Sequence, residues 1–268
     1  VLLDIKKYVK VQSLEEAYEL CQNRKNIIIG GMLWLKMQNR SVDTAIDLCD
    51  LNLNHIEDKG DEIHIGAMVT LRQLESNPIL HQYTHGAIKE SVHNSVGVQF
   101  INRATVGGSL FGRYRFSDVL TMFLALDAYV ERYHCGIVSI QEFATMRPTP
   151  DVLVRVIIKK SPLRVVYMSQ RNTKTDFPVL TCAVSQIETT YTCTIGARPL
   201  KAVTFKDENH FLDSSLSDES IQAFANDIAK KLVLGSNLRG SADYRRRIAK
   251  VLIKRALTAL REENHHAY

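Results

Sequence analysis

Two short glycine-containing segments are the strongest candidates for chemistry in this sequence. The first is an apolar run that ends at Gly30 and Gly31, and the second runs from Thr105 through Gly107 and Gly108. Glycine lets a ligand approach the main chain, and a helix that starts after such a turn offers unpaired N–H groups, so both segments could hold a phosphate. A Gly-Gly pair after an apolar strand is more often only a turn, so the structural interpretation of each segment stays open.

The familiar nucleotide-binding motifs are absent at both segments. Neither G-x-G-x-x-G nor G-x-x-x-x-G-K-[ST] occurs there, which disfavours an ordinary dinucleotide-binding domain and a phosphate loop of the kinase type. Two separate glycine pairs that hold one extended ligand instead favour a pyrophosphate-bridged cofactor lying between two subdomains.

The composition is that of an ordinary globular protein. The chain has 268 residues, of which 45% are hydrophobic and 24% charged, so one large or two medium domains are expected. Its net charge of +5 gives no reason to invoke nucleic acid. No apolar run reaches the length of a membrane span and the first residues lack the layout of a signal peptide, so a cytoplasmic protein without membrane contact is expected.

The five cysteines are odd in number and contain no C-x-x-C pair: Cys21, Cys49, Cys135, Cys182 and Cys193. This spacing favours a reducing compartment. It also argues against a metal or iron–sulfur site made by this chain alone.

The first 160 residues alternate between strand and helix patterns, which predicts an α/β layer arrangement with some parallel pairing. Helices are expected from Ser13 to about Arg24, at Leu35–Arg40, from Thr70 to Asn77, over 79–96, and from Ser117 or Asp118 to about Leu126. Strands are expected at Ile27–Ile29, Ala45–Leu48, Glu62–Gly66, Ala128–His134 and Val152–Lys159.

From about residue 161 the pattern changes to successive strands followed by two helices, which is typical of an α+β domain. The strands are expected at 165–168, 179–189, 191–195 and 202–205, and the helices at 218–234 and 242–261. Arg245, Arg246 and Arg247 on the last helix favour a solvated face over a nucleic-acid site.

The order of these motifs resembles one known family. Ile28-Ile29-Gly30-Gly31, the stretch from Asp61 to Leu71, Ala104 to Ser109, Asp118-Val119-Leu120, Arg171 with Asp176-Phe177-Pro178, and the segment from Ser241 to Arg247 look like the FAD-binding medium subunit of molybdenum hydroxylases. Xanthine dehydrogenase and carbon monoxide dehydrogenase belong to this family. The resemblance spans essentially the whole chain.

The resemblance implies an α+β protein in which residues 1–160 form an FAD-binding domain of the vanillyl-alcohol-oxidase/PCMH-like type. Its two subdomains would cover about 1–55 and 56–160, and 161–268 would form a smaller α+β domain with an antiparallel sheet and helices. Carried over residue by residue, the FAD-binding positions are Ile28, Ile29, Gly30, Gly31, Met32, Leu33, Trp34, Thr105, Gly107, Gly108, Ser109 and Asp118.

The function implied is that of an oxidoreductase subunit that transfers electrons and has no catalytic side chain and no metal of its own. Electrons would pass from a molybdopterin-binding subunit through an iron–sulfur subunit to FAD here, and then to NAD⁺ or another acceptor. Met32 and Leu33 are apolar where the family often has polar residues, and Ser109 stands where a carboxamide or carboxylate is common. They motivate the alternative of a structural subunit that has lost FAD. Trp34 could either stack on a ligand or fill the core.

Overall fold

The computed structural model describes residues 3–266 and divides into two compact units. The first unit contains the chain up to Asn77 together with Gly97–Gly112 and Ala128–Lys159. The second contains Pro78–Val96, Arg113–Asp127 and the chain from Lys160 on. These units follow contacts in space, whereas the division at residue 160 follows chain order and stays a prediction.

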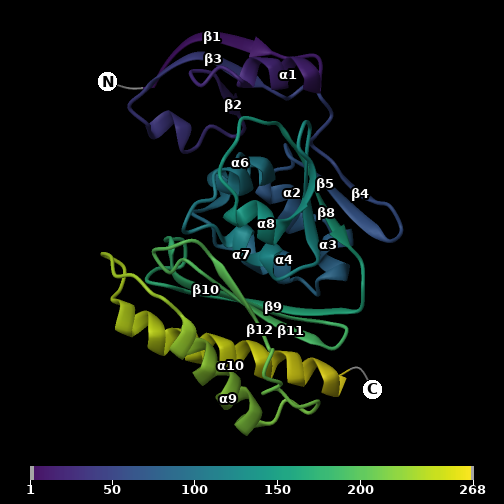
Figure 1. Ribbon diagram of the computed structural model, residues 1–268, viewed down its shortest axis with the longest axis vertical. Coiled ribbons are helices and arrows are strands. Elements are labelled where there is room, and N and C mark those ends of the chain that lie inside the picture. Colours follow the sequence, from purple (N-terminus) through teal and green to yellow (C-terminus); the bar gives the residue numbers. More distant parts are fainter. Residues whose placement is uncertain (1–2, 267–268) are drawn as a thin grey trace. The chain divides into compact units, whose positions relative to one another are not determined.

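A small parallel sheet begins the first unit (Figure 1). Its strands β1 (Asp4–Lys10), β3 (Ser41–Asp47) and β2 (Ile27–Ile29) lie in the order β1-β3-β2, and both pairs are parallel, as the alternating pattern predicted. Helix α1 (Leu14–Cys21) connects β1 to β2, and the Ser13 hydroxyl caps it by accepting from the Glu16 N–H. Its buried Ala17 packs with Ile46 of the sheet.

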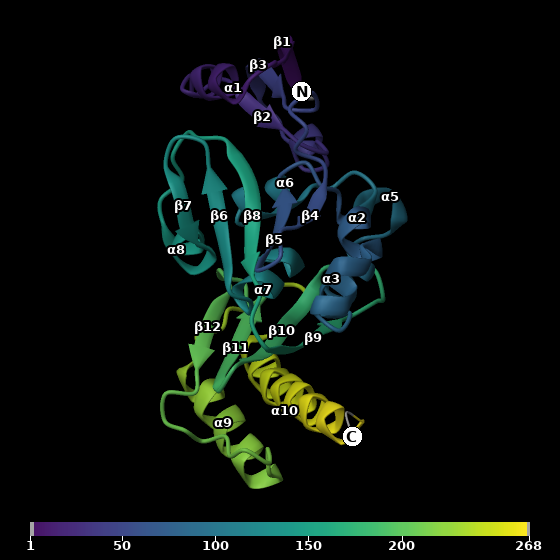
Figure 2. The same cartoon turned by 90° about the vertical axis from the view of Figure 1, so that its right-hand side faces the viewer.

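The larger sheet of the first unit is antiparallel (Figure 2). In order across the sheet its strands are β4 (Ile56–Asp58), β5 (Glu62–Gly66), β8 (Leu153–Lys159), β6 (Ala128–Arg132) and β7 (Gly136–Ser139). The helices of this unit outside the parallel sheet are α2 (Leu71–Ser76), α5 (Val98–Ile101), α6 (Val106–Phe111) and α8 (Ile140–Thr145). The sequence did not predict β1, β4, β7, α5 or α8, and it gave no bounds for α6. Except for β1, these elements are six residues or shorter, so each offers little periodicity to read.

The second unit is built on a four-stranded antiparallel sheet with helices on both faces (Figure 1). The strands β9 (Leu163–Arg171), β10 (Pro178–Ile187), β11 (Thr190–Gly196) and β12 (Val203–Lys206) lie in the order β12-β11-β10-β9, which confirms the predicted strand series. Helices α9 (Asp218–Lys231) and α10 (Ala242–His266) cover one face, and α4 (Ala87–His93) and α7 (Asp118–Leu124) contact the other. Because both faces are covered, β10 is buried along most of its length.

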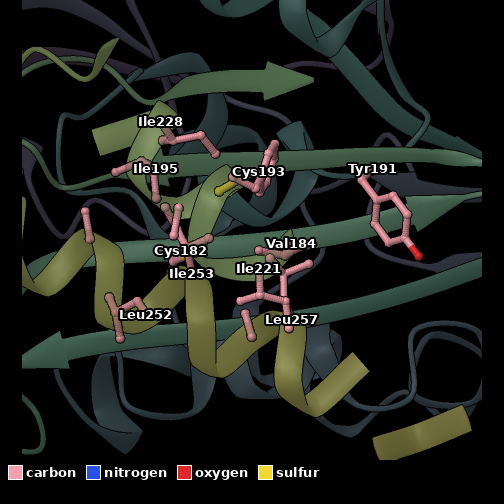
Figure 3. Close-up of a cluster of buried hydrophobic side chains, with 14 of the residues drawn as sticks. Cys182, Val184, Tyr191, Cys193, Ile195, Ile221, Ile228, Leu252, Ile253 and Leu257 are labelled. Atoms are coloured by element: carbon pink, nitrogen blue, oxygen red, sulfur yellow. The ribbon is translucent and has the colours of Figure 1, made fainter. Parts of the chain in front are cut away.

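The core between this sheet and α9 and α10 is shown in Figure 3. It brings Cys182 and Cys193 of the sheet against Ile228 of α9 and Leu252 of α10. Both cysteines are free, fully buried thiols. They therefore serve here as small apolar side chains.

Three local predictions were wrong. The helical stretch 79–96 is two helices, α3 (Pro78–Tyr83) and α4, because His85 and Gly86 take positive φ angles of 47° and 82° and break the helix. The segment after Gly31 is only one turn of 3-10 helix, η1 (Leu35–Met37), and therefore offers little helix dipole.

The third wrong prediction concerns Arg245, which was expected on a solvated face. Its side chain is fully buried and does not belong to a solvated face. It donates to the main-chain oxygens of Val179, Gly235 and Gly240 and to the side chain of Asn237. Four acceptors from two separate segments satisfy the guanidinium, which ties the 235–240 loop to β10.

Candidate functional site

The first glycine segment presents a row of unused main-chain donors. Within the described part of the chain, no acceptor bonds to the N–H groups of Gly30, Gly31, Met32 and Leu33. All four residues are partly exposed, and Met32 has a positive φ of 58°. Successive N–H groups around a left-handed residue form a concavity that binds anions. The turn can therefore accept a phosphate through the main chain alone.

The bulky side chains in this turn pack against the protein. Met32 lies on the cluster formed by Ile29, Leu35 and Ala45. The Trp34 ring lies 5.6 Å from the ring of Phe100, with an interplanar angle of 59°. The structure therefore gives Trp34 an intramolecular partner, and Met32, which departs from the family pattern, contributes to packing beside the turn.

The second glycine segment is the first turn of helix α6, where a strand-to-helix turn was expected. Thr105 is the N-cap, and its hydroxyl accepts from the Gly108 N–H at 3.1 Å. The Val106 and Gly107 N–H groups donate to the carbonyls of Val69 and Ala67, both at 2.8 Å. The Ser109 N–H donates to the Thr105 carbonyl at 3.0 Å. These donors are occupied within the fold, so the segment differs from the first turn in what it can offer a ligand.

The two segments lie against each other. A Cβ on Gly31 would lie 1.9 Å from the Arg103 carbonyl oxygen, and one on Gly30 would lie 2.6 Å from the Thr105 hydroxyl. Both distances are far below normal contact, so glycine is needed for this close approach. A Cβ on the exposed Gly108 would meet only the Thr105 hydroxyl, at 3.1 Å. Gly108 is therefore the glycine of this pair of segments that faces open space.

Asp118 belongs to the second unit and is 7% exposed. Its carboxylate accepts from the Tyr167 hydroxyl at 2.5 Å, from the Arg171 guanidinium at 2.8 Å and from the Ser95 hydroxyl at 3.2 Å. Burial raises the pKa of Asp118, while the positive charge of Arg171 and the bond from Tyr167 act against that rise. The assignment of Asp118 to the flavin stays a prediction.

Arg171 extends this network beyond Asp118. It donates to the main-chain oxygen of Asp176 at 2.6 Å, and the Asp176 carboxylate in turn accepts from Arg239 at 2.9 Å. The sequence placed Arg171 and Asp176 in a motif without giving either a role. A buried ion pair between residues 53 positions apart leaves no local signature that sequence reasoning can use.

Comparison with known proteins identifies the family. Residues 3–160 match the model of the FAD binding domain in molybdopterin dehydrogenase, and residues 165–260 match that of the CO dehydrogenase flavoprotein C-terminal domain. The chain belongs to this flavoprotein family. It is therefore an FAD-binding oxidoreductase chain, as the resemblance implied.

Relatives are similar over nearly their whole length. The chain is 25% identical to the nicotine 6-hydroxylase medium subunit of Paenarthrobacter nicotinovorans, over 94% of this chain and 95% of that one. It is 22% identical to the glyceraldehyde dehydrogenase medium chain of Sulfolobus acidocaldarius, over 93% and 96%. The fold matches a chain of carbon monoxide dehydrogenase from Hydrogenophaga pseudoflava with a TM-score of 0.84 and 22% identity, over 95% and 96% of the two chains.

The described residues show neither a membrane-spanning helix nor a metal-binding cluster. They contain no helix long and apolar enough to cross a membrane. Nor do they contain a group of three or more His, Cys, Asp or Glu side chains that could hold a metal ion.

Proposed function

We propose that this chain is the electron-transfer subunit of a molybdopterin-dependent hydroxylase or dehydrogenase complex similar to xanthine dehydrogenase. Electrons would reach its FAD from an iron–sulfur subunit and leave to NAD⁺ or another acceptor. The names of the relatives support a complex of several chains, since they are a medium subunit of a hydroxylase and a medium chain of a dehydrogenase.

The observation that carries the proposal is the row of unused N–H donors from Gly30 to Leu33. A pyrophosphate is a dianion that prefers several oriented donors, and main-chain N–H groups supply them without a cationic side chain. The residues present therefore fit the diphosphate part of FAD. When bound, FAD supplies the redox chemistry, and the chain supplies position and electrostatics.

The position of each remaining residue supports the role proposed for it. Ile28 and Ile29 would place the turn at the end of β2, and Met32 and Trp34 would fix it by packing on their own side of the unit. Thr105, Gly107, Gly108 and Ser109 would form the wall beside it, with Gly107 allowing the close contact to Ala67 and Gly108 leaving space for the cofactor. Asp118, whose carboxylate Arg171 and Tyr167 orient, would accept from a sugar or ribityl hydroxyl.

The alternative is a structural subunit of the same kind of complex that has lost FAD. Met32, Leu33 and Ser109 motivated this alternative. The packing of Met32 against Ile29, Leu35 and Ala45 weakens that argument, because this side chain has a place within the fold.

The test is isolation of the native complex, followed by anaerobic addition of reductant. We expect one FAD for each copy of this chain and bleaching of the flavin absorbance when the reducing substrate of the complex is added. The isolated chain should carry FAD and show no bleaching with that substrate, because the partner subunits are missing. A colourless chain that takes up no FAD on reconstitution would favour the structural alternative, and FAD that substrate fails to reduce in the complex would refute the electron route.

A further inference from the structure

Four loops of the second unit meet in a closed ring. The segments are 113–117, 172–178, 197–201 and 232–240, and together they are called the basic ring below. Each neighbouring pair is joined by a direct contact, so the ring is a structural feature and not a grouping by charge.

Two of these contacts are hydrogen bonds to main-chain oxygens. The Arg115 guanidinium donates to the carbonyl of Pro199 at 3.3 Å, which joins the first segment to the third. Arg198 donates to the carbonyl of Val233 at 2.6 Å, which joins the third to the fourth.

The other two contacts involve Phe177. The guanidinium of Arg239 lies over its ring, 4.9 Å from the centroid, and Arg239 also pairs with Asp176. The Phe116 ring also packs against the Phe177 ring, with the two centroids 4.6 Å apart. The second segment is thereby held by both the fourth and the first.

The basic ring carries the net charge of the whole chain. It contains six basic residues, Arg113, Arg115, Lys174, Arg198, Lys201 and Arg239, and one acidic residue, Asp176. Removing six from the 34 basic residues and one from the 29 acidic residues leaves 28 of each sign elsewhere. By residue count the basic ring therefore carries a net charge of +5. Arg113 is only 8% exposed, so the other five basic side chains make up the accessible positive surface. The neighbouring Arg171 and Asp118 pair with each other and do not alter that count.

The ring also exposes apolar side chains. Leu238 is fully exposed, at 106% of its reference area, and Val233 and Leu200 are 65% and 36% exposed. The loop that carries Leu238 is held by the buried Arg245, which bonds to Gly235, Asn237 and Gly240 on either side of the tip. An exposed leucine on a loop whose conformation is fixed by hydrogen bonds loses little conformational entropy when it enters a pocket.

We propose that the basic ring is a docking surface for another protein, and that this partner presents carboxylates around an apolar pocket that receives Leu238. The exposed positive charge favours a partner of opposite charge. A projecting, fully exposed leucine fits a pocket on a macromolecule better than it fits a small anion, which would leave that side chain in water. The proposal does not depend on the electron route or on where FAD binds.

The test uses the chain in the assembly isolated from the cells that produce it. Leu238→Asp removes the apolar tip, and Lys174→Glu reverses an exposed charge of the ring. Ile137→Asp, at a 59% exposed position on β7, and Lys89→Glu, at an exposed position on α4, are matched controls outside the ring. Circular dichroism and FAD content are measured for every variant, so that loss of fold or of cofactor is distinguished from loss of the partner.

We expect both ring variants to bind the partner chain about tenfold more weakly, as found for central anchors and charges of an interface, and both controls to bind normally. The Lys174→Glu effect should shrink at high salt because exposed charges are then screened. Carbodiimide, which joins a lysine amine directly to a carboxylate, should link Lys174 to an Asp or Glu of that partner. Normal binding by both ring variants would overturn the proposal. So would cross-links confined to this chain, or protection of Lys174 by an adenine nucleotide or an oligonucleotide but by no protein chain.

Discussion

Gly31 and Gly108 should respond to substitution in opposite ways, because different groups lie next to them. In Gly31→Ala the new Cβ would lie 1.9 Å from the Arg103 carbonyl oxygen, whereas carbon and oxygen normally stay about 3.3 Å apart or more. The obstructing atom belongs to the main chain, so the turn must move by more than about 1 Å. Overpacking of this kind costs about 1–3 kcal/mol of unfolding free energy.

Gly108→Val should leave the fold nearly unchanged. The residue is exposed in the first turn of α6, and its nearest neighbour is a side-chain hydroxyl, that of Thr105. Valine is a slightly better helix former than glycine, so the unfolding free energy should change by less than about 1 kcal/mol. Its two methyl groups would occupy the space proposed for the cofactor. We expect FAD to bind at least about tenfold more weakly, equivalent to about 1.4 kcal/mol.

Thermal unfolding without FAD and titration with FAD separate the two effects. Gly31→Ala should lower the Tm by about 2–4 °C for each kcal/mol lost. Gly108→Val should leave the Tm unchanged and lower the affinity for FAD. The FAD affinity of Gly108→Ala should lie between those of Gly108→Val and the wild type. Wild-type FAD affinity in Gly108→Val would refute the idea that this position faces the cofactor. An unchanged Tm in Gly31→Ala would refute the close packing of the two glycine segments.

Three further predictions concern single side chains. Asp118→Asn leaves the buried Arg171 without its ion partner and should lower the unfolding free energy by about 3–5 kcal/mol. The double variant that adds Arg171→Met should recover part of this loss. Urea denaturation measures both, and an equal loss in the single and double variants would contradict the pairing. Trp34 is the only tryptophan, so its fluorescence should be quenched as FAD binds, and emission that stays constant while FAD absorbance appears on the protein would place the cofactor elsewhere. Hydrogen bonds from Ser217 and Ser215 lower the pKa of Asp213, so its stabilising effect should be complete above its unfolded pKa of about 3.9 and be lost as the pH falls through its lower folded value. The difference in urea midpoint between the wild type and Asp213→Asn should therefore shrink between pH 6 and about pH 3, and an equal difference at both would count against this cause.

Local chemistry was enough to predict the elements whose start signals lie in the sequence. Ser13 and Glu16 mark the start of α1, and Thr70 and Gln73 form the reciprocal capping box of α2. The strands of the second unit were equally accessible, because successive β-branched and apolar runs are separated by turn residues. In these cases a few adjacent residues determine the conformation, so a sequence pattern suffices.

Other features depend on partners far away in the chain. His85 and Gly86 break a stretch whose apolar spacing is helical throughout, and no proline marks the break. The burial of Arg245 relies on carbonyls of Val179 and Gly235, which only the folded chain brings to one place. A triple-arginine sequence on a helix therefore looked like a solvated face, because the neighbours that satisfy one of the three are not in the pattern.

The two glycine pairs also show what a sequence pattern cannot predict. Their sequences are alike, but their main-chain N–H groups differ in whether the protein itself supplies an acceptor. The Gly107 N–H is taken by the carbonyl of Ala67, while the Gly30 and Gly31 N–H groups have no acceptor in the described chain. A glycine pair predicts that something approaches the main chain closely, without saying whether it is a ligand or the protein itself. The Arg103 carbonyl occupies the position where a Gly31 side chain would begin, and the Gly31 N–H remains available for a phosphate. The absence of a Cβ on Gly31 thus permits close packing, while its main-chain N–H can bind a ligand. A substitution at Gly31 therefore affects folding and binding together, whereas a substitution at Gly108 can separate them.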